Sequence, residues 1–227
     1  MQRSVVLDSV AQQIGALSAA QPVCVGIDGI DTAGKTTFAD ELAVILQETR
    51  RQVIRASVDG FHNPRAVRYQ RGKLSPEGYY SDTFNVNAIR ELLLDPLSEG
   101  GSRRYCTANY DLAHESPIEP EYKQATEDAI LIVDGVFLHR PELRSYWDFS
   151  VYLNISPATA LQRAFKRDTV VFGSIEAVQD RYQRRYIPGQ QLYLDRCQPA
   201  QIATVVIDHN DVDAPHVMSE RVQPLAK

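Results

Sequence analysis

Residues 29–36 read GIDTAGKT and match the pattern G-x-x-x-x-G-K-[ST] at every fixed position. In such a loop the glycines let the backbone approach an anion, and successive N–H groups point at phosphate oxygens. Lys35 places a positive charge beside the outer phosphates, and the Thr36 hydroxyl is a ligand for Mg²⁺. The loop therefore predicts a site for ATP and Mg²⁺; a glycine-rich turn without a ligand is the alternative. The nucleotide contacts are assigned to Gly29, Ile30, Asp31, Thr32, Ala33, Gly34, Lys35, Thr36 and Thr37.

An aspartate follows each of three apolar runs, at Asp28, Asp59 and Asp134. If these runs are parallel strands, their carboxyl ends lie at one edge of a sheet, where α/β proteins bind ligands. Asp134 is predicted to orient Mg²⁺ or its water ligands, and Asp59 could accept a proton from an attacking hydroxyl. Each residue could instead be a turn aspartate that ends a strand, and for Asp28 we favour that interpretation.

The elements that position these residues alternate along the chain. Apolar runs of strand length occupy residues 23–27, 53–58, 129–133, 149–155 and 202–207. Helical spacing of apolar residues, or a helix-starting proline, marks residues 5–20, 35–51, 157–167 and 174–186. Alternation of this kind predicts an α/β fold with a parallel sheet and helices on both faces.

Residues 61–125 have a different composition, rich in Tyr, Arg, Pro and Gly, and only residues 86–94 are convincingly helical. A long irregular segment inside a compact domain is usually functional. We therefore predict an acceptor-binding lobe at 61–125, inserted into one domain spanning 1–227 whose core is 1–60 and 126–227.

Several side chains of this lobe have two interpretations. Its tyrosines could stack on a flat acceptor or could pack the lobe itself; they are Tyr79, Tyr80, Tyr105 and Tyr110. A basic run could bind an anionic acceptor or form a solvated surface; it consists of Arg65, Arg68, Arg71 and Lys73.

Composition excludes several classes of protein. The chain has 227 residues and a formal net charge of −5, with a pI near 5.6, which argues against broad nucleic-acid binding. No run approaches the about 18 apolar residues that a membrane span needs. Its three scattered cysteines fit neither a disulfide framework nor a zinc site. We expect a cytoplasmic protein that binds neither nucleic acid nor membrane, and we leave open whether it forms a homo-oligomer.

With these residues placed, the sequence from about Val23 to Asn210 resembles the uridine kinase, phosphoribulokinase and pantothenate kinase group of P-loop kinases. The resemblance rests on the phosphate-binding loop and on five further motifs. These are Asp59-Gly60-Phe61-His62, Tyr110-Asp111, Asp134-Gly135, Arg163 and Arg167-Asp168. The group's fold implies a three-layer P-loop NTPase domain with a five-stranded parallel sheet and a lid after the fourth strand.

The resemblance also implies roles for individual residues. Asp59 matches the catalytic base, and Asp134 matches the acid after the third core strand. Arg163 and Arg167 match the lid helix, where they would join Lys35 in stabilising the transferring group; four residues apart, they share one helical face and could instead be a solvated basic face. The acceptor contacts that we expect are His62, Tyr79, Tyr80, Tyr110 and His114.

These expectations define the function that we predict and its alternatives. The leading hypothesis is transfer of the ATP γ-phosphoryl group to a hydroxyl of a small metabolite, with a nucleoside such as uridine or cytidine as the first acceptor. Pantothenate or a sugar is the alternative acceptor. A nucleotide-hydrolysing switch or accessory protein without a metabolite acceptor is the alternative of a different class.

Overall fold

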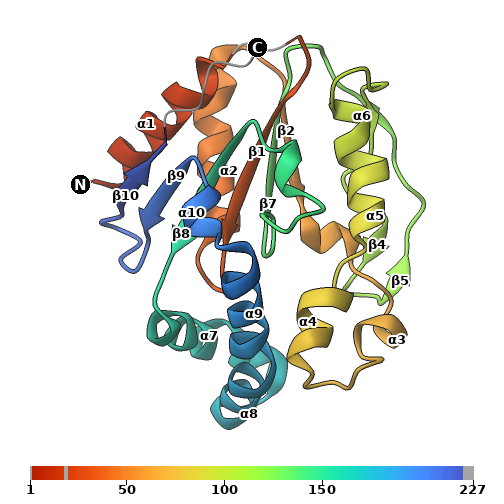
Figure 1. The fold of residues 1–227 in the computed structure, drawn as a ribbon, viewed down its shortest axis with the longest axis vertical. Helices are drawn as coiled ribbons and strands as arrows, with labels where there is room; N and C mark the ends of the chain where they lie inside the picture. Colours follow the sequence, from red (N-terminus) through yellow and green to blue (C-terminus); the bar gives the residue numbers. More distant parts are fainter. Residues whose placement is uncertain (1, 18–19, 222–227) are drawn as a thin grey trace.

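The computed structural model describes residues 2–17 and 20–221, and within them one central sheet has six strands in the order β10-β9-β8-β1-β7-β2 (Figure 1). The strands are β1 (Val23–Gly29), β2 (Val53–Ser57), β7 (Ile130–Gly135), β8 (Phe149–Asn154), β9 (Val205–Asp208) and β10 (His216–Glu220). The five expected strands are present and parallel. The sixth, β10, is antiparallel to β9 and was not predicted, because this short and mostly exposed edge strand has no apolar run.

Two apolar layers sandwich the sheet, as the predicted three-layer fold requires. Val25 and Ile27 of β1 pack toward α1 (Arg3–Gly15) and α2 (Lys35–Leu46). Leu131 and Val133 of β7 belong to a second cluster on the opposite face. Since successive side chains of a strand point to opposite faces, strands covered on both sides read as continuous apolar runs. This is why the core strands could be located from the sequence.

The first two helices end earlier than predicted. Helix α1 ends at Gly15 rather than near residue 20, and residues 18 and 19 lie outside the described residues. Helix α2 ends at Leu46, and a short 3₁₀ turn, Gln47–Thr49, continues it toward the expected end at residue 51.

Residues 61–125, the predicted lobe between β2 and β7 and here called the inserted segment, are more helical than predicted. Its helical elements are α3 (Arg65–Arg68), α4 (Pro76–Asp82), α5 (Val86–Ile89), a π turn (Arg90–Leu94) and α6 (Asp95–Leu97). It also contains two short antiparallel strand pairs: β3 (Arg104–Tyr105) with β6 (Lys123–Gln124), and β4 (Tyr110–Asp111) with β5 (Ser116–Pro117). The helix expected at 86–94 is present. Helix α4 was missed although Ser75 caps it by accepting the Gly78 N–H at 3.0 Å.

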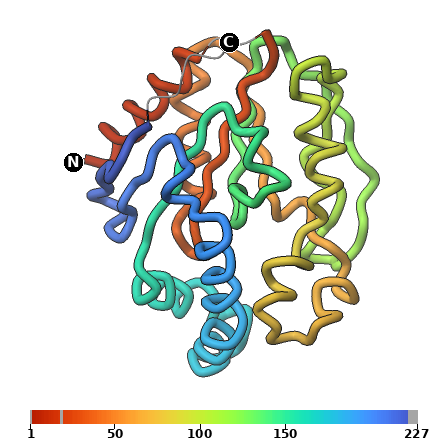
Figure 2. Tube along the Cα trace, viewed as in Figure 1, coloured from red at the N-terminus to blue at the C-terminus, as the bar shows by residue number. Residues whose placement is uncertain are grey.

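The segment after β8 forms a long helical arm. It contains α7 (Pro157–Phe172), α8 (Ile175–Arg181), a π turn (Tyr182–Tyr186), α9 (Ile187–Cys197) and α10 (Pro199–Ile202). The prediction that a helix ends near residue 186 is wrong, because the π turn Tyr182–Tyr186 leads directly into α9, and Pro188 lies in the first turn of α9, where its missing N–H is tolerated. Helix α9 packs against α4, so the arm and the inserted segment lie side by side beyond the sheet (Figure 2). Among the described residues, no helix is both long and apolar enough to cross a membrane.

Candidate active site

The phosphate-binding loop connects β1 to α2 in the geometry that its sequence predicts. Gly34 adopts a left-handed conformation with φ 88°, which glycine tolerates without strain. At Gly29 an added Cβ would lie 2.7 Å from the Leu153 carbonyl oxygen, so close packing against β8 also requires glycine. The Lys35 ammonium donates to the Ile30 carbonyl at 2.9 Å and therefore lies within the curve of the loop. Burial lowers the pKa of Lys35, and four surrounding aspartates oppose this effect.

The pair Thr36 and Asp134 forms the candidate magnesium site. The Thr36 hydroxyl donates to Asp134 Oδ2 at 2.7 Å, and Asp134 is almost completely buried. Arg55 donates to the other carboxylate oxygen at 2.8 Å and so fixes its orientation. Mg²⁺ usually takes only one or two protein oxygens and completes its shell with phosphate oxygens and water. One hydroxyl and one oriented carboxylate beside the loop fit that requirement.

A cavity of about 440 Å³ opens at the carboxyl edge of the sheet, between the loop, the helical arm and the inserted segment. The end predicted to bind the nucleotide, called the nucleotide end below, is lined by Asp31, Thr32, Gly34, Lys35, Thr36, Thr37, Arg163 and Arg167. The opposite end, where we expect the acceptor and which is called the acceptor end below, is lined by His62, Tyr79, Thr83, Phe84 and Tyr186. Ser57, Asp59, Asp134, Gly135 and Val136 lie on the wall between the two ends, on segments that follow or end β2 and β7.

Asp59 and His62 share a tight turn that directly follows β2. The 3₁₀ segment Val58–Phe61 presents the Asp59 carboxylate to the cavity, and its backbone N–H donates to Ser57 Oγ at 3.3 Å. His62 Nδ1 donates to the Asp59 carbonyl at 2.9 Å, which assigns the free lone pair of the ring to Nε2. Crowding by protein raises the pKa of Asp59, against the opposing effects of His62 and Lys35. Burial lowers the pKa of His62, so its ring is neutral near pH 7.

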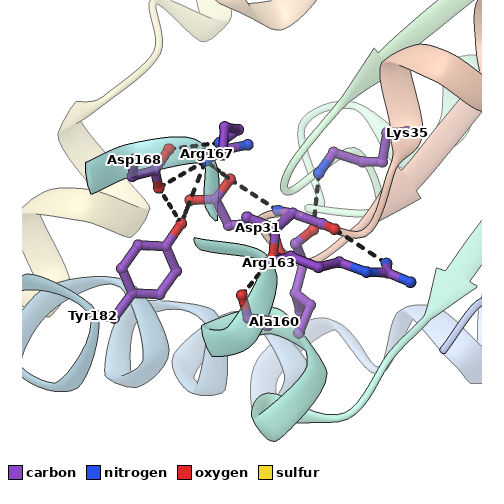
Figure 3. A network of polar contacts seen from close by, with 9 residues as sticks. Asp31, Lys35, Ala160, Arg163, Arg167, Asp168 and Tyr182 are labelled. Atoms are coloured by element: carbon purple, nitrogen blue, oxygen red, sulfur yellow. Dashed lines mark hydrogen bonds and ion pairs between the residues drawn. The ribbon is translucent and has the colours of Figure 1, made fainter. Parts of the chain in front are cut away.

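Two arginines of α7 reach the loop from the helical arm. Arg163 donates to the Thr32 carbonyl at 3.2 Å and to the His209 carbonyl at 2.8 Å. Arg167 forms ion pairs with Asp31 and with Asp168 (Figure 3). The α7 arginines predicted to assist transfer therefore lie on the cavity rather than on a solvated outer face.

Three of the five predicted acceptor contacts do not line the cavity. Tyr80 is buried behind it, with its hydroxyl 3.5 Å from Cys197 Sγ. Tyr110 donates to Glu115 Oε2 at 3.1 Å, and His114 is exposed and pairs with the Asp111 carboxylate. His62 and Tyr79 do line it.

The structure adds residues that sequence reasoning missed. Thr83 and Phe84 line the acceptor end beside His62, because residues 61–63 and 83–85 are joined by backbone hydrogen bonds. Tyr186 reaches the same end from the helical arm, 4.9 Å from the Tyr79 ring centre. Arg55, which contacts the Asp134 carboxylate, was also missed. The sequence does mark it, because Arg55 is the one charged residue within strand β2.

Known proteins resemble this chain in sequence. The family model described as "Phosphoribulokinase / Uridine kinase family" matches residues 24–213. The chain belongs to this family. A pantothenate kinase of Lacticaseibacillus casei (strain BL23) is 25% identical over 181 residues, covering 75% of this chain and 57% of the relative. The uridine kinase-like protein 3 of Arabidopsis thaliana is 26% identical over 174 residues, covering 74% of this chain and 36% of that protein. The chain thus spans between a third and three fifths of the length of these relatives.

Solved structures show the same fold as this phosphoribulokinase/uridine kinase family member. One described as a possible uridine kinase from Bacillus stearothermophilus gives a TM-score of 0.71 at 24% identity, covering 89% of this chain and 97% of that chain. Phosphoribulokinase from Rhodobacter spheroides gives 0.59 at 16% identity, with 84% and 71% covered. D-glycerate 3-kinase from Cryptococcus neoformans gives 0.57 at 11% identity, with 95% and 97% covered. These P-loop kinases are named for different acceptors, so the shared fold does not by itself identify the acceptor of this chain.

Proposed function

We propose that this chain transfers the γ-phosphoryl group of ATP to a hydroxyl of a small uncharged metabolite, with uridine or cytidine as the first acceptor. The observation that carries the proposal is the position of the Asp59 carboxylate, which faces the same cavity as Lys35 from the wall between the two ends. A carboxylate in that position can hold the acceptor hydroxyl against the phosphate chain that the loop binds.

The nucleotide end supplies electrostatic stabilisation. The N–H groups of the loop and the Lys35 ammonium would hold the β- and γ-phosphates, while Arg163 and Arg167 offset charge on the transferring group. Thr36 and Asp134 would hold Mg²⁺, which neutralises phosphate charge when it is bound.

The proton transfer is assigned to Asp59. As the acceptor oxygen bonds to the γ-phosphorus, the bond from that phosphorus to the β-bridging oxygen breaks, and ADP leaves with the electron pair. The acceptor's proton passes to the Asp59 carboxylate and then to solvent. The raised pKa of Asp59 brings it closer to the working pH, which favours general-base catalysis.

The charge balance of the acceptor end favours an uncharged acceptor. Among the described residues that line the cavity, the cationic side chains Lys35, Arg163 and Arg167 all belong to the nucleotide end. His62 is the one ionisable base of the acceptor end, and its lowered pKa leaves it neutral. A carboxylate there would therefore meet the Asp59 charge without a compensating cation.

The basic run of the inserted segment does not supply that cation. Arg68 is buried and forms a short ion pair with Glu115, and Arg71 pairs with Asp82 at 2.9 Å. Neither guanidinium lines the cavity. The acceptor end is instead lined by the aromatic rings of Tyr79, Phe84 and Tyr186, which suit stacking against a flat or apolar group.

An acceptor panel tests this proposal. The protein would be incubated with Mg·ATP and, separately, uridine, cytidine, ribose, pantothenate or a neutral amide of pantothenate, and ADP release would be compared with the acceptor-free rate. We expect stimulation by a nucleoside, and more stimulation by the pantothenate amide than by pantothenate. Preference for the carboxylate form would support the pantothenate alternative, and equal rates with and without acceptor would support the switch alternative.

A further inference from the structure

Asp31 of the phosphate-binding loop joins the loop to the helical arm. Asp31 Oδ1 lies 3.2 Å from an amino nitrogen of Arg167, and Asp31 Oδ2 lies 3.0 Å from the Tyr182 hydroxyl (Figure 3). Arg167 also donates to Asp168 Oδ1 at 2.6 Å, and the Tyr182 hydroxyl lies 2.8 Å from Asp168 Oδ2. One loop residue therefore contacts both α7 and the π turn that follows α8.

A carboxylate is an unusual group to find at the phosphate-binding end of the cavity. Asp31 and Arg167 both line that end, where the loop's N–H groups and Lys35 attract anions. Burial would raise the pKa of Asp31, but the charges of Arg167 and Lys35 lower it below its ordinary value. The side chain is therefore an anion that would repel the phosphates of a bound nucleotide.

Stability alone does not explain this ion pair. The Arg167 side chain is 56% exposed, and ion pairs with so exposed a partner contribute little to folding. The pair lies instead where a nucleotide's phosphates would approach, so bound phosphates would compete with Asp31 and Asp168 for the guanidinium. A carboxylate at this point determines where Arg167 is held and how much of its charge is free.

We propose that Asp31 is a positioning residue that holds Arg167 over the loop, partly neutralises it in the free enzyme and shares the guanidinium with the phosphates of bound ATP. The inference rests on the proposed function, because it assigns Arg167 to the transferring phosphoryl group. Tyr182 supports the arrangement because its hydroxyl contacts both Asp31 and Asp168 and so ties the π turn to the loop and to α7.

The Asp31→Asn variant removes the charge of Asp31 and keeps the shape of the side chain, so it separates the effect on nucleotide binding from the effect on phosphoryl transfer. In Asp31→Asn the repulsion of phosphates is removed, so we expect the Kd for Mg·ATP to fall by about fivefold. Arg167 loses its charged anchor on the loop, so kcat should fall by about 10- to 100-fold. A purely structural residue would not tighten nucleotide binding while slowing turnover.

The chain offers a matched control on the same arm. Asp180 of α8 pairs with Arg184 of the π turn at 3.4 Å, both side chains are more than half exposed, and neither residue lines the cavity. Asp180→Asn removes one carboxylate from one arginine as Asp31→Asn does, and it should leave both the Kd for Mg·ATP and kcat unchanged. Should Asp31→Asn fail to fold, Tyr182→Phe keeps every charge and should lower kcat by a smaller factor.

The deciding experiment is a double-mutant cycle with Arg167→Ala, measuring Mg·ATP affinity by calorimetry and kcat with the best acceptor. If Asp31 acts through Arg167, Asp31→Asn lowers kcat in the wild-type background and does not lower it in the Arg167→Ala background. Equal kcat losses in both backgrounds, or an unchanged Kd for Mg·ATP, would overturn the inference. Calorimetry needs no acceptor, so a wild-type protein that binds ATP but phosphorylates nothing would contradict the proposed function and leave the Asp31 affinity test intact.

Discussion

Thr36 and Asp134 are 98 residues apart in sequence, and the Thr36 hydroxyl donates to the Asp134 carboxylate at 2.7 Å. The contact joins the start of α2 to the end of β7, which pairs directly with β1. Arg55 of β2 holds the second oxygen of the same carboxylate, so three neighbouring elements fix one candidate Mg²⁺ ligand. Asp134 has almost no exposed surface, so its carboxylate cannot turn freely toward Mg²⁺. The proposed chemistry therefore depends on the orientation that these contacts fix.

Arg55→Gln tests the orientation of Asp134. Removing the guanidinium leaves a buried carboxylate without its charged partner, which should cost about 3 kcal/mol of unfolding free energy. The Mg²⁺ concentration needed for half-maximal turnover should also rise. The control is Asp40→Asn, which removes the exposed partner of Arg55 and should cost less than about 1 kcal/mol. Equal losses in urea unfolding for the two variants would contradict the assigned role of Arg55.

Asp59→Asn should abolish phosphoryl transfer and leave ATP affinity nearly unchanged. A folded-state pKa above the unfolded value means that the ionised Asp59 opposes folding at neutral pH, so its removal should also raise the melting temperature. The measurements are product formation, nucleotide titration and thermal unfolding at pH 7. Normal turnover in this variant would remove Asp59 from the mechanism.

The pH profile should have an acid limb set by Asp59. Because crowding raises the pKa of Asp59, the ionised base is lost at a pH above the usual 3.8 as the solution is acidified. Below neutral pH, where His62 becomes protonated, its charge favours the ionised form of Asp59, so His62→Gln should move this limb of the kcat/KM profile to still higher pH. An acid limb that stays in place or moves to lower pH would contradict this effect of His62 on the pKa of Asp59.

Thr83→Val tests the acceptor end. Thr83 lines the cavity, and its hydroxyl is buried and finds no hydrogen-bond partner among the described residues. If it binds an acceptor hydroxyl, the valine variant should raise the acceptor KM by about fivefold, since one hydrogen bond is worth about 1 kcal/mol. The fold should not be destabilised, and Thr83→Ser should restore the KM. An unchanged acceptor KM in Thr83→Val would assign Thr83 to packing alone.

The nucleotide end could be predicted from the sequence because its determinants are local. The loop motif between β1 and α2 specifies its own backbone geometry, and Asp59 and Asp134 follow apolar strands whose ends must meet in a parallel sheet. The acceptor end could not be predicted in the same way. Thr83 reaches it through pairing with residues 61–63, and Tyr186 reaches it through packing of the arm against α4.

Local patterns also failed where tertiary contacts decide the outcome. Nothing in the sequence around Tyr110 shows that its hydroxyl binds Glu115, or that Glu115 also pairs with the buried Arg68. Likewise, a proline usually interrupts a helix, but Pro188 lies in the first turn of α9 directly after a π turn, and the helical arm continues through it.

Mass spectrometry of the product formed from Mg·ATP and uridine tests whether the chain transfers a phosphoryl group to this acceptor. We expect a uridine phosphoester with the wild-type chain, and none with Asp59→Asn although that variant still binds ATP. Free inorganic phosphate released equally by both proteins, with uridine unmodified, would contradict it.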